Sequence, residues 1–341
     1  MSTKENIKPF VSVVIPMRNE EKYIKKCLVS FIKQDYPNDR FEIIVVDGQS
    51  EDNSSNIVAE VMDTNNNIYM VENEKKITPI ALNIGVKHAK GDIIIIFSSH
   101  GFADSNFLTN NVKVHIKNKV DCVGGTIKTI GEDFQSKAIS LAQSSVFGVG
   151  NSLFRYSNKA QFVDTVAFGA YSKDVFNEIG YFDETLVRNQ DFEFNHRIIK
   201  NGGKIFLEPS IKSYYYARSS IIKLFVQYLM YGFWKVRVVT KHADAFRFRY
   251  QVPALFVSSL ILFSILSLMH NTFLLILFSI VSSYLLVIFL ASIYKSAKSR
   301  IKNILILPFV FCALHFGFGI GFLIGTIELF YHKITRIFRH S

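Results

Sequence analysis

Three short clusters of polar residues hold the side chains best suited to chemistry. They occupy residues 16–20, 47–52 and 98–100, and each follows a run of β-branched or other apolar residues. The carboxylates of Glu20 and Asp47 can accept hydrogen bonds from a ribose or a base. Taken singly, each cluster is explained more simply by a solvated turn or a helix cap. Three such clusters in one chain favour a shared binding crevice.

The elements that would position these clusters alternate between strand and helix. Strands are predicted at residues 11–15, 41–46, 68–71 and 92–97, and helices at 21–33, 53–62, 78–88 and 190–200. This alternation predicts an α/β domain with a mostly parallel central sheet covered by helices. Ligands of such sheets bind beyond the carboxyl ends of the strands. The three polar clusters all lie at such ends.

The composition excludes a disordered chain, since 49% of the 341 residues are hydrophobic and 20% are charged. The net charge of +11 suits nucleic acid, anionic lipid or a phosphorylated substrate without choosing among them. Cys27, Cys122 and Cys312 are too far apart in sequence for a disulfide framework or a zinc site. We expect three buried structural thiols.

The C-terminal third is far more apolar than the rest. Residues 252–294 and 303–327 contain no Asp, Glu, Lys or Arg. Because one membrane span takes about 20 apolar residues, the first run predicts a helical hairpin, 252–269 and 273–294, around a polar turn. The second run predicts a third membrane segment. There Ala313, Gly317, Gly321 and Gly325 recur every four residues, which predicts a smooth helix face for close packing against another helix.

The orientation of these segments follows from their basic flanks. Residues 235–249 and 295–302 are rich in Lys and Arg. The positive-inside rule places both clusters in the cytoplasm, together with the large N-terminal domain. Residues 1–10 lack the form of a signal peptide, so no export of that domain is expected. The basic tail at 332–341 conflicts with a single crossing of the third segment, and Pro308 could break that segment or make it re-entrant.

Several stretches, taken in order, resemble glycosyltransferase family 2. They are VSVVIPMRNE, VVDGQSEDNS, TPIALNIGVKHAKGDIIIIF and RNQDFEFNHRI. SSVFGVGNSLFR, VDTVAFGAYSKDVFNEIGYFDE and QYLMYGFWK resemble the membrane-bound subgroup that builds succinoglycan-type exopolysaccharides. The resemblance covers about residues 8–240. It implies a GT-A domain at 1–240 that ends in an interfacial helix at about 219–240, a membrane region at 252–331 and a basic tail at 332–341.

The resemblance implies a donor site at the strand ends. Asp47 is similar to the carboxylate that binds the donor nucleotide, commonly a uridine. Glu20 corresponds to a ribose or base contact, and Pro16 is a further donor-binding residue. Asn83 with Gly85 matches an N-x-G turn beside the nucleotide. Lys76 is either a phosphate contact or a solvated lysine.

The resemblance also implies a catalytic base. Asp191 matches the carboxylate that removes the proton of the acceptor hydroxyl, and direct displacement by that hydroxyl inverts the anomeric centre. Gln190 stands where many relatives have an acidic residue. A helix cap is the alternative role of Asp191. Arg188 either holds a phosphate or pairs with Glu193.

Gln227 and Trp234 lie in a segment that resembles the Q-x-x-R-W motif of processive relatives, with changed spacing. Aromatic faces suit sugar rings. The same mixture of residues suits a helix lying at the membrane interface. Both interpretations stay open.

The metal site departs from the family pattern. Ser98-Ser99-His100 stands where the family has D-x-D, which binds a divalent metal such as Mn²⁺ or Mg²⁺. His100 fits the D-A-H variant of the subgroup, but Ser98 lacks the first carboxylate. Three readings remain: a metal held by the diphosphate and His100, a metal-free site that uses basic residues, and an inactive domain.

The function implied is an inverting, membrane-bound glycosyltransferase of the cell inner membrane. It would be a multi-pass protein with a cytoplasmic catalytic domain, and would move a sugar from a UDP-sugar to a lipid-linked saccharide in cell-surface or exopolysaccharide synthesis. Other polysaccharide-assembly proteins fit as partners, and nucleic acid does not. The alternatives are transfer to a polyprenyl phosphate, which needs no base, and a non-catalytic subunit. A channel fits poorly, since the apolar segments lack charged residues.

Overall fold

The computed structural model describes residues 8–297 and 304–339. The chain forms two compact units, one of Met1–Lys128 with Ser152–Tyr216 and one of Thr129–Asn151 with Ala217–Ser341. The helix expected at about 219–240 thus groups with the C-terminal helices, whereas the sequence analysis placed it at the end of the first domain. That predicted domain boundary stays a prediction.

The first unit is built on a mixed sheet with strand order β3-β2-β1-β4-β8-β6-β9-β5, and β7 pairs with β9. The first four strands in this order pair in parallel, whereas β8 pairs antiparallel with both β4 and β6, and β9 pairs antiparallel with β5 and β7. The strands are β1 Val11–Met17, β2 Phe41–Asp47, β3 Ile68–Glu72, β4 Ile93–Ile96, β5 Gly101–Ala103, β6 Cys122–Ile130, β7 Gln161–Phe162, β8 Ala167–Ser172 and β9 Ile205–Tyr216. The predicted α/β class is confirmed.

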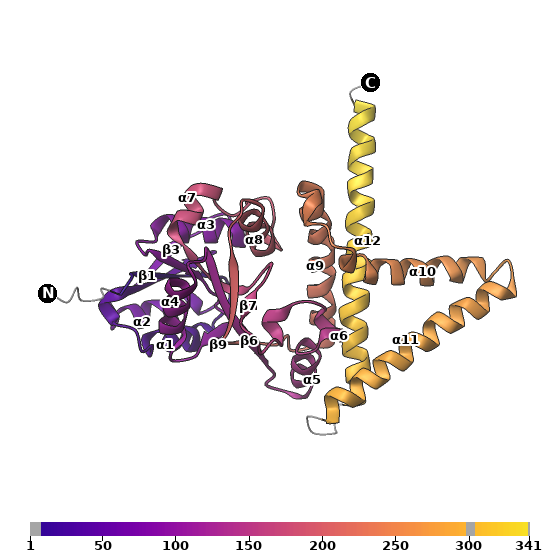
Figure 1. Ribbon diagram of the computed structural model, residues 1–341, viewed down its shortest axis with the longest axis horizontal. Coiled ribbons are helices and arrows are strands. Elements are labelled where there is room, and N and C mark those ends of the chain that lie inside the picture. Colours follow the sequence, from indigo (N-terminus) through magenta and orange to yellow (C-terminus); the bar gives the residue numbers. More distant parts are fainter. Residues whose placement is uncertain (1–7, 298–303, 340–341) are drawn as a thin grey trace. The chain divides into compact units, whose positions relative to one another are not determined.

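Helices cover both faces of this sheet (Figure 1). The side chains of a strand alternate between the two faces, so each face carries apolar residues that the helices bury. Val13 and Ile15 of β1 lie in a core shared with α1, α2 and α4, whereas Val14 lies in a core shared with α3, α7 and α8. The helices are α1 Ile24–Ile32, α2 Ser54–Met62, α3 Thr78–His88, α4 Phe107–Asn118, α7 Lys173–Ile179 and α8 Gln190–Lys200.

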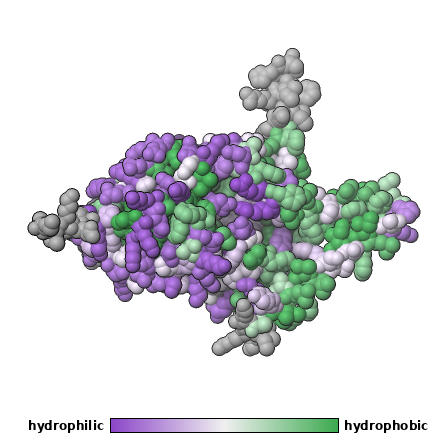
Figure 2. Space-filling view, in the orientation of Figure 1, coloured by the Kyte–Doolittle hydropathy of each residue, from purple (hydrophilic) through white to green (hydrophobic). Residues whose placement is uncertain are grey.

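The second unit is helical. Its elements are α5 Phe134–Gln143, α6 Val146–Val149, α9 Ile221–Lys241, the 3₁₀ turns η3 Ala243–Ala245 and η4 Phe248–Tyr250, α10 Val252–Leu266, α11 Asn271–Ala297 and α12 Leu307–Arg339. Figure 2 shows apolar side chains gathered over these C-terminal helices. Two of them, Asn271–Ala297 and Leu307–Tyr331, are long and apolar enough to cross a membrane. Lys298, Arg300 and Lys302 of the predicted basic flank lie outside the described residues.

The smooth face predicted for the third apolar segment is present on α12. A Cβ atom at Gly317, Gly321 or Gly325 would come 2.7, 1.9 or 2.8 Å from a backbone carbonyl oxygen of α9. Only glycine permits such an approach, so the prediction of close helix packing is confirmed and α9 is the partner. Pro308 lies in the first turn of α12, where its missing N–H costs nothing. The helix therefore continues unbroken past the predicted break.

Two of the three cysteines are buried, as expected. Cys27 and Cys122 are inaccessible, and burial raises the pKa of both thiols well above the usual range. Cys312 is only half-buried, so the expectation was wrong for that residue. It lies on α12, one of whose faces remains uncovered by protein.

Candidate active site

The polar clusters after β1, β2 and β4 meet at one edge of the sheet. These strands are parallel neighbours, so their carboxyl ends point the same way. The backbone N–H of Asn19 donates to Ser50 Oγ at 3.0 Å and joins the first two clusters. Ser99 Oγ donates to the carbonyl of Pro16 at 3.0 Å and joins the first and third.

Asp47 is the last residue of β2, and its side chain is held by two serines. Ser50 Oγ donates to Oδ1 at 2.6 Å, and Ser55 Oγ donates to Oδ2 at 2.9 Å. The residue is 9% exposed. The backbone N–H of Ser50 also donates to the carboxylate, at 3.2 Å. A carboxylate offers about four acceptor positions, so these three donors orient Asp47 and leave one position for a ligand that donates a hydrogen bond, such as a ribose.

Three residues around Asp47 have a left-handed backbone. The φ angles are 55° at Asn19, 54° at Gln49 and 60° at Lys76. Each costs of order 1 kcal/mol or more, and such residues cluster at functional sites. The Lys76 turn is tied to the same edge, because the N–H of Asn73 donates to the carbonyl of Asp47 at 2.8 Å. Lys76 is therefore held near the strand ends, and its phosphate role stays a prediction.

Glu20 and His100 form a pair. Glu20 Oε2 lies 2.9 Å from His100 Nδ1, and both side chains are largely shielded from solvent. The ring of Tyr23 packs edge-on against the imidazole with centroids 4.2 Å apart. The sequence analysis gave these two residues separate roles, in ribose or base binding and in metal binding. The structure instead couples them through a hydrogen bond.

The pair fits a metal ligand. A carboxylate that holds one ring nitrogen of a histidine orients the other toward a metal ion, and Nε2 of His100 is that other nitrogen. Ser98 Oγ accepts a hydrogen bond from the backbone N–H of His100 at 3.2 Å, which fixes the turn. His100 thus supplies one oriented nitrogen, and further ligands would come from diphosphate oxygens and water.

Asn83 and Gly85 lie inside α3, so the expected turn at these residues was wrong. The Asn83 side chain donates to the Phe182 carbonyl and to Glu184 Oε1, both at 2.9 Å, and accepts from the Phe182 N–H at 2.9 Å. A Cβ at Gly85 would come 2.2 Å from Val14, so the glycine lets α3 approach the sheet. These contacts give Asn83 a bracing role between α3 and the loop before α8. Its predicted contact with the nucleotide stays a prediction.

Asp191 lies in the first turn of α8 and is exposed. Its Oδ1 accepts the N–H of Phe192 at 2.8 Å, and the helix N-terminus favours its negative charge. Asn189, the residue before α8, has a φ of 62°. Phe194 anchors the helix, stacked on Phe176 with ring centroids 5.0 Å apart. The carboxylate is thus available to an acceptor on a rigid element, and its role as the base stays a prediction.

Gln190 begins α8, and Arg188 lies two residues before it. The sequence analysis left open a pair between Arg188 and Glu193. In the structure Glu193 accepts hydrogen bonds from Arg197 at 2.8 and 3.1 Å. The phosphate role of Arg188 and the effect of Gln190 on the base stay predictions.

Gln227 and Trp234 both lie on α9 in the second unit. Gln227 is buried and its Nε2 donates to Tyr231 at 2.9 Å. The Arg237 guanidinium lies over the Trp234 ring, 4.6 Å from its centroid. Both side chains are engaged in packing the second unit, and their roles toward the acceptor stay predictions.

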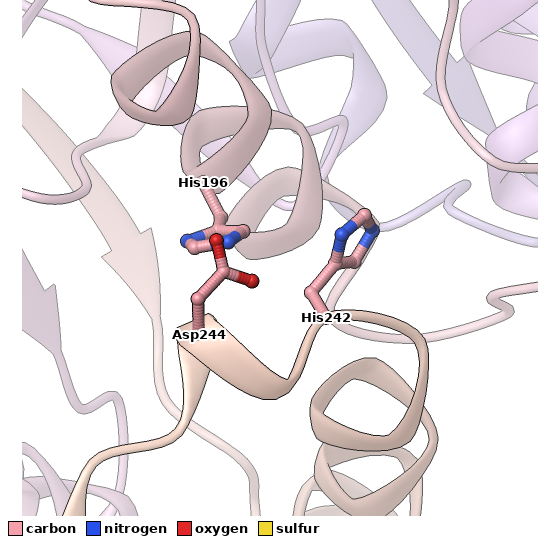
Figure 3. A group of neighbouring side chains, drawn as sticks. All are labelled: His196, His242 and Asp244. Carbon is pink, nitrogen blue, oxygen red and sulfur yellow. The ribbon is translucent and has the colours of Figure 1, made fainter.

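His196, His242 and Asp244 are drawn in Figure 3. His196 belongs to α8 of the first unit, whereas His242 and Asp244 belong to the second. Because the three residues come from different compact units, they do not define a metal site.

The sequence analysis missed the residues that orient the site. Ser50 and Ser55 fix Asp47, and Tyr23 packs on His100. The role of Ser50 could have been predicted from its spacing, because a serine three residues after an aspartate often donates both its N–H and its hydroxyl to that carboxylate. Nothing local indicates Tyr23, because its partner lies far along the chain.

Comparison with known proteins identifies the class. The model described as glycosyl transferase family 2 matches residues 12–180. A Methanococcus voltae protein is 34% identical over 327 residues, which are 94% of this chain and 98% of the relative. It is named dolichyl N-acetyl-alpha-D-glucosaminyl phosphate 3-beta-D-2,3-diacetamido-2,3-dideoxy-beta-D-glucuronosyltransferase. The succinoglycan biosynthesis protein ExoA of Rhizobium meliloti is 25% identical over 255 residues, 74% of this chain and 77% of its own.

The chain therefore belongs to glycosyl transferase family 2, and it is an inverting glycosyltransferase. Solved structures agree on the fold. A mannosyltransferase from Pyrobaculum calidifontis, in complex with GDP-Man and Mn²⁺, has a TM-score of 0.54 at 19% identity and covers 71% of this chain and 66% of its own. TarS 1-349 from S. aureus, in complex with UDP-GlcNAc, has a TM-score of 0.54 at 17% identity, with 92% and 90% covered. The GT-A architecture predicted from the resemblance is confirmed.

Proposed function

We propose that this enzyme moves a sugar from a UDP-sugar to a saccharide carried on a polyprenyl phosphate, at the cytoplasmic face of a cell membrane. The observation that supports binding of a UDP-sugar is the Asp47 carboxylate, which two hydroxyls orient at the edge where three parallel strands end. The acceptor half is supported by the Methanococcus relative, whose name describes transfer to a dolichyl phosphate-linked sugar and which matches over nearly its whole length.

The chemistry needs few groups. Asp47 accepts hydrogen bonds from the donor nucleoside, and Lys76 contacts a phosphate of the donor. The Asp191 carboxylate removes the proton of the acceptor hydroxyl as that oxygen attacks the anomeric carbon. The bond from this carbon to the diphosphate breaks, and UDP leaves with the electron pair. Attack opposite the leaving group inverts the anomeric centre.

A divalent ion fits this site through His100. His100 Nε2 would hold it, with Glu20 fixing the ring through Nδ1. When bound, such an ion neutralises the negative charge that develops on the departing diphosphate. The imidazole ligand favours Mn²⁺ over Mg²⁺, which prefers oxygen ligands throughout.

A second candidate is direct transfer to a polyprenyl phosphate. A Trichomonas vaginalis relative named dolichyl-phosphate beta-glucosyltransferase ALG5D favours it, at 27% identity over 151 residues. That acceptor is already ionised and needs no base. Asp191 therefore discriminates the two candidates.

The test uses the purified full-length chain with labelled UDP-sugars and two acceptors, a polyprenyl phosphate and a polyprenyl phosphate-linked sugar. Asp191→Asn should lower transfer to the lipid-linked sugar by about 10²–10⁴-fold and leave UDP binding unchanged. Asp174→Asn is the matched control, because Asp174 is an exposed carboxylate in the first turn of α7. Retention of more than half the rate by Asp191→Asn would remove it from the mechanism, and preference for the bare phosphate would favour the second candidate.

A further inference from the structure

The two helices that are long enough to cross a membrane differ sharply in how they are covered by protein. Only 6% of the most apolar stretch of α11 is buried, against 50% of that of α12. We propose that α12 does not cross the membrane but lies along its cytoplasmic surface together with α9. The α10–α11 hairpin is then the part that enters the lipid.

Helix α12 cannot cross the membrane without α9, because the two helices pack along each other. The two helices run parallel, with Gly317 on the carbonyl of Phe225 and Gly325 on that of Phe233. Near the end of this contact Arg237 Nη2 donates to Glu328 Oε2 at 2.7 Å. If α12 ran along the membrane normal, α9 would run with it, and the basic segment that follows α9 would lie on the far side. That placement violates the positive-inside rule.

The backbone around α6 also contacts α12 at His315, the ninth residue of that helix. His315 Nε2 bonds the carbonyl of Phe147 in the short helix α6 at 2.8 Å. Three residues earlier, the carbonyl of Ser144 accepts a hydrogen bond from Lys295 Nζ at 2.7 Å. Lys295 belongs to the basic flank of the hairpin. Irregular backbone does not occur exposed in the hydrocarbon region, so this part of α12 lies at the level of that flank, at the membrane surface.

The direction of α10 also places α12 in the membrane plane. This helix starts at the middle of α12, where a Cβ at Gly319 would come 2.5 Å from the Pro253 carbonyl, and then runs away from α12 rather than along it (Figure 1). Two diverging helices cannot both follow the membrane normal. The outer part of α10 is exposed and apolar, with Ile261, Leu262 and Ile265 more than half exposed. An apolar surface of this kind suits lipid. We therefore place α10 along the membrane normal and α12 in the membrane plane.

The charge distribution supports the same arrangement. With α12 in the plane, the basic segment at 235–249, Lys295 and the basic C-terminal part of α12 all meet the same leaflet. The conflict between the tail and a single crossing then disappears. The outward side of α12 carries Phe309, Ile324, Ile327 and Tyr331, all exposed, which suit the boundary between headgroups and acyl chains. The partner of this surface is therefore an anionic lipid leaflet.

The test measures depth along α12 with nitroxide labels. Single cysteines at Phe309, Ile320, Ile324 and Tyr331 would be labelled in the full chain with Cys312 replaced by Ala. The protein is reconstituted in vesicles of phosphatidylethanolamine and the anionic phosphatidylglycerol. The first and last positions are 22 residues apart, about 33 Å along a helix. A crossing helix would therefore bring them to opposite interfaces, because the hydrocarbon core is about 30 Å thick.

We expect one shallow depth at all four positions. Labels at Leu285 and Leu286, exposed near the middle of α11, are the control and should lie deeper than all four. A depth profile on α12 with a maximum near Ile320 would overturn the proposal. Fully aqueous labels on α12 would overturn it as well. As a second measurement, a cysteine at Thr335, near the end of α12, should resist an impermeant thiol reagent in intact cells, and its labelling from outside would also overturn the proposal.

Discussion

Replacement of Asp47 by Ala should weaken UDP binding by about 10- to 150-fold. The carboxylate is fixed by Ser50 and Ser55 and is 9% exposed, so a donor hydrogen bond to it is a bond to a charged and largely desolvated group. Such bonds contribute about 1.5–3 kcal/mol. At about 1.4 kcal/mol per factor of ten, the loss of one bond gives the stated range. Ser55→Ala removes only an orienting hydroxyl and should cost less than about tenfold.

The assay is calorimetric titration of UDP into the detergent-solubilised full chain. Asp52→Ala is the matched control, because Asp52 is a carboxylate of the same polar cluster that instead accepts hydrogen bonds from the backbone of Ser54 and Glu21. It should leave UDP affinity within about twofold of the parent. Unchanged affinity in Asp47→Ala would refute the placement of the donor site. An equal loss in both variants would assign the effect to disorder of the loop rather than to a lost contact.

Three further perturbations have defined outcomes. His100→Ala should raise the Mn²⁺ concentration needed for half-maximal transfer and Ser98→Asp should lower it, since a second hard ligand fixes the ion; full activity in excess chelator would reject the metal. Gly321→Val should lower the unfolding free energy by about 1–3 kcal/mol or more, because a Cβ would come 1.9 Å from an α9 carbonyl, whereas the exposed Ile327→Ala should change the melting temperature little. Asp133→Ala should destabilise the start of α5 by about 0.5–2 kcal/mol at neutral pH. Hydrogen bonds from the first turn of α5 lower the pKa of Asp133, so its contribution is present above the unfolded pKa and is lost as pH falls. The melting difference between variant and parent should therefore shrink below about pH 4, and a constant difference would contradict the capping role.

Local pattern was enough to predict most of the first unit. The helix at Thr78–His88 has the predicted bounds because a proline in the first turn and a change of periodicity mark it. Strand β1 runs two residues beyond the prediction, to Met17, since its pairing with Asp47 of β2 extends the ladder past Pro16. Such an extension depends on the neighbouring strand and leaves no local signal.

For the glycine stripe on α12, helix periodicity predicts the face that packs but not the helix against which it packs. A spacing of four places Gly317, Gly321 and Gly325 on one face of any helix, so close packing followed from the sequence. The partner did not, because α9 lies about ninety residues earlier and nothing in its sequence marks it as the neighbour. The same limit applies to Asn83, whose bonds to Phe182 span 99 residues.

The Glu20–His100 pair joins residues 80 positions apart and changes how the departure at Ser98 is understood. From the sequence, loss of a carboxylate at Ser98 leaves a lone histidine, which is a poor site for a divalent ion. In the structure that histidine already has a carboxylate on Nδ1, so its Nε2 is held in one orientation. The predicted ribose or base contact of Glu20 stays a prediction, and a metal ion on Nε2 would be held by an imidazole that Glu20 orients. The carboxylate missing at Ser98 thus has a counterpart in Glu20, which would support a metal ion by orienting the imidazole rather than by binding the ion directly.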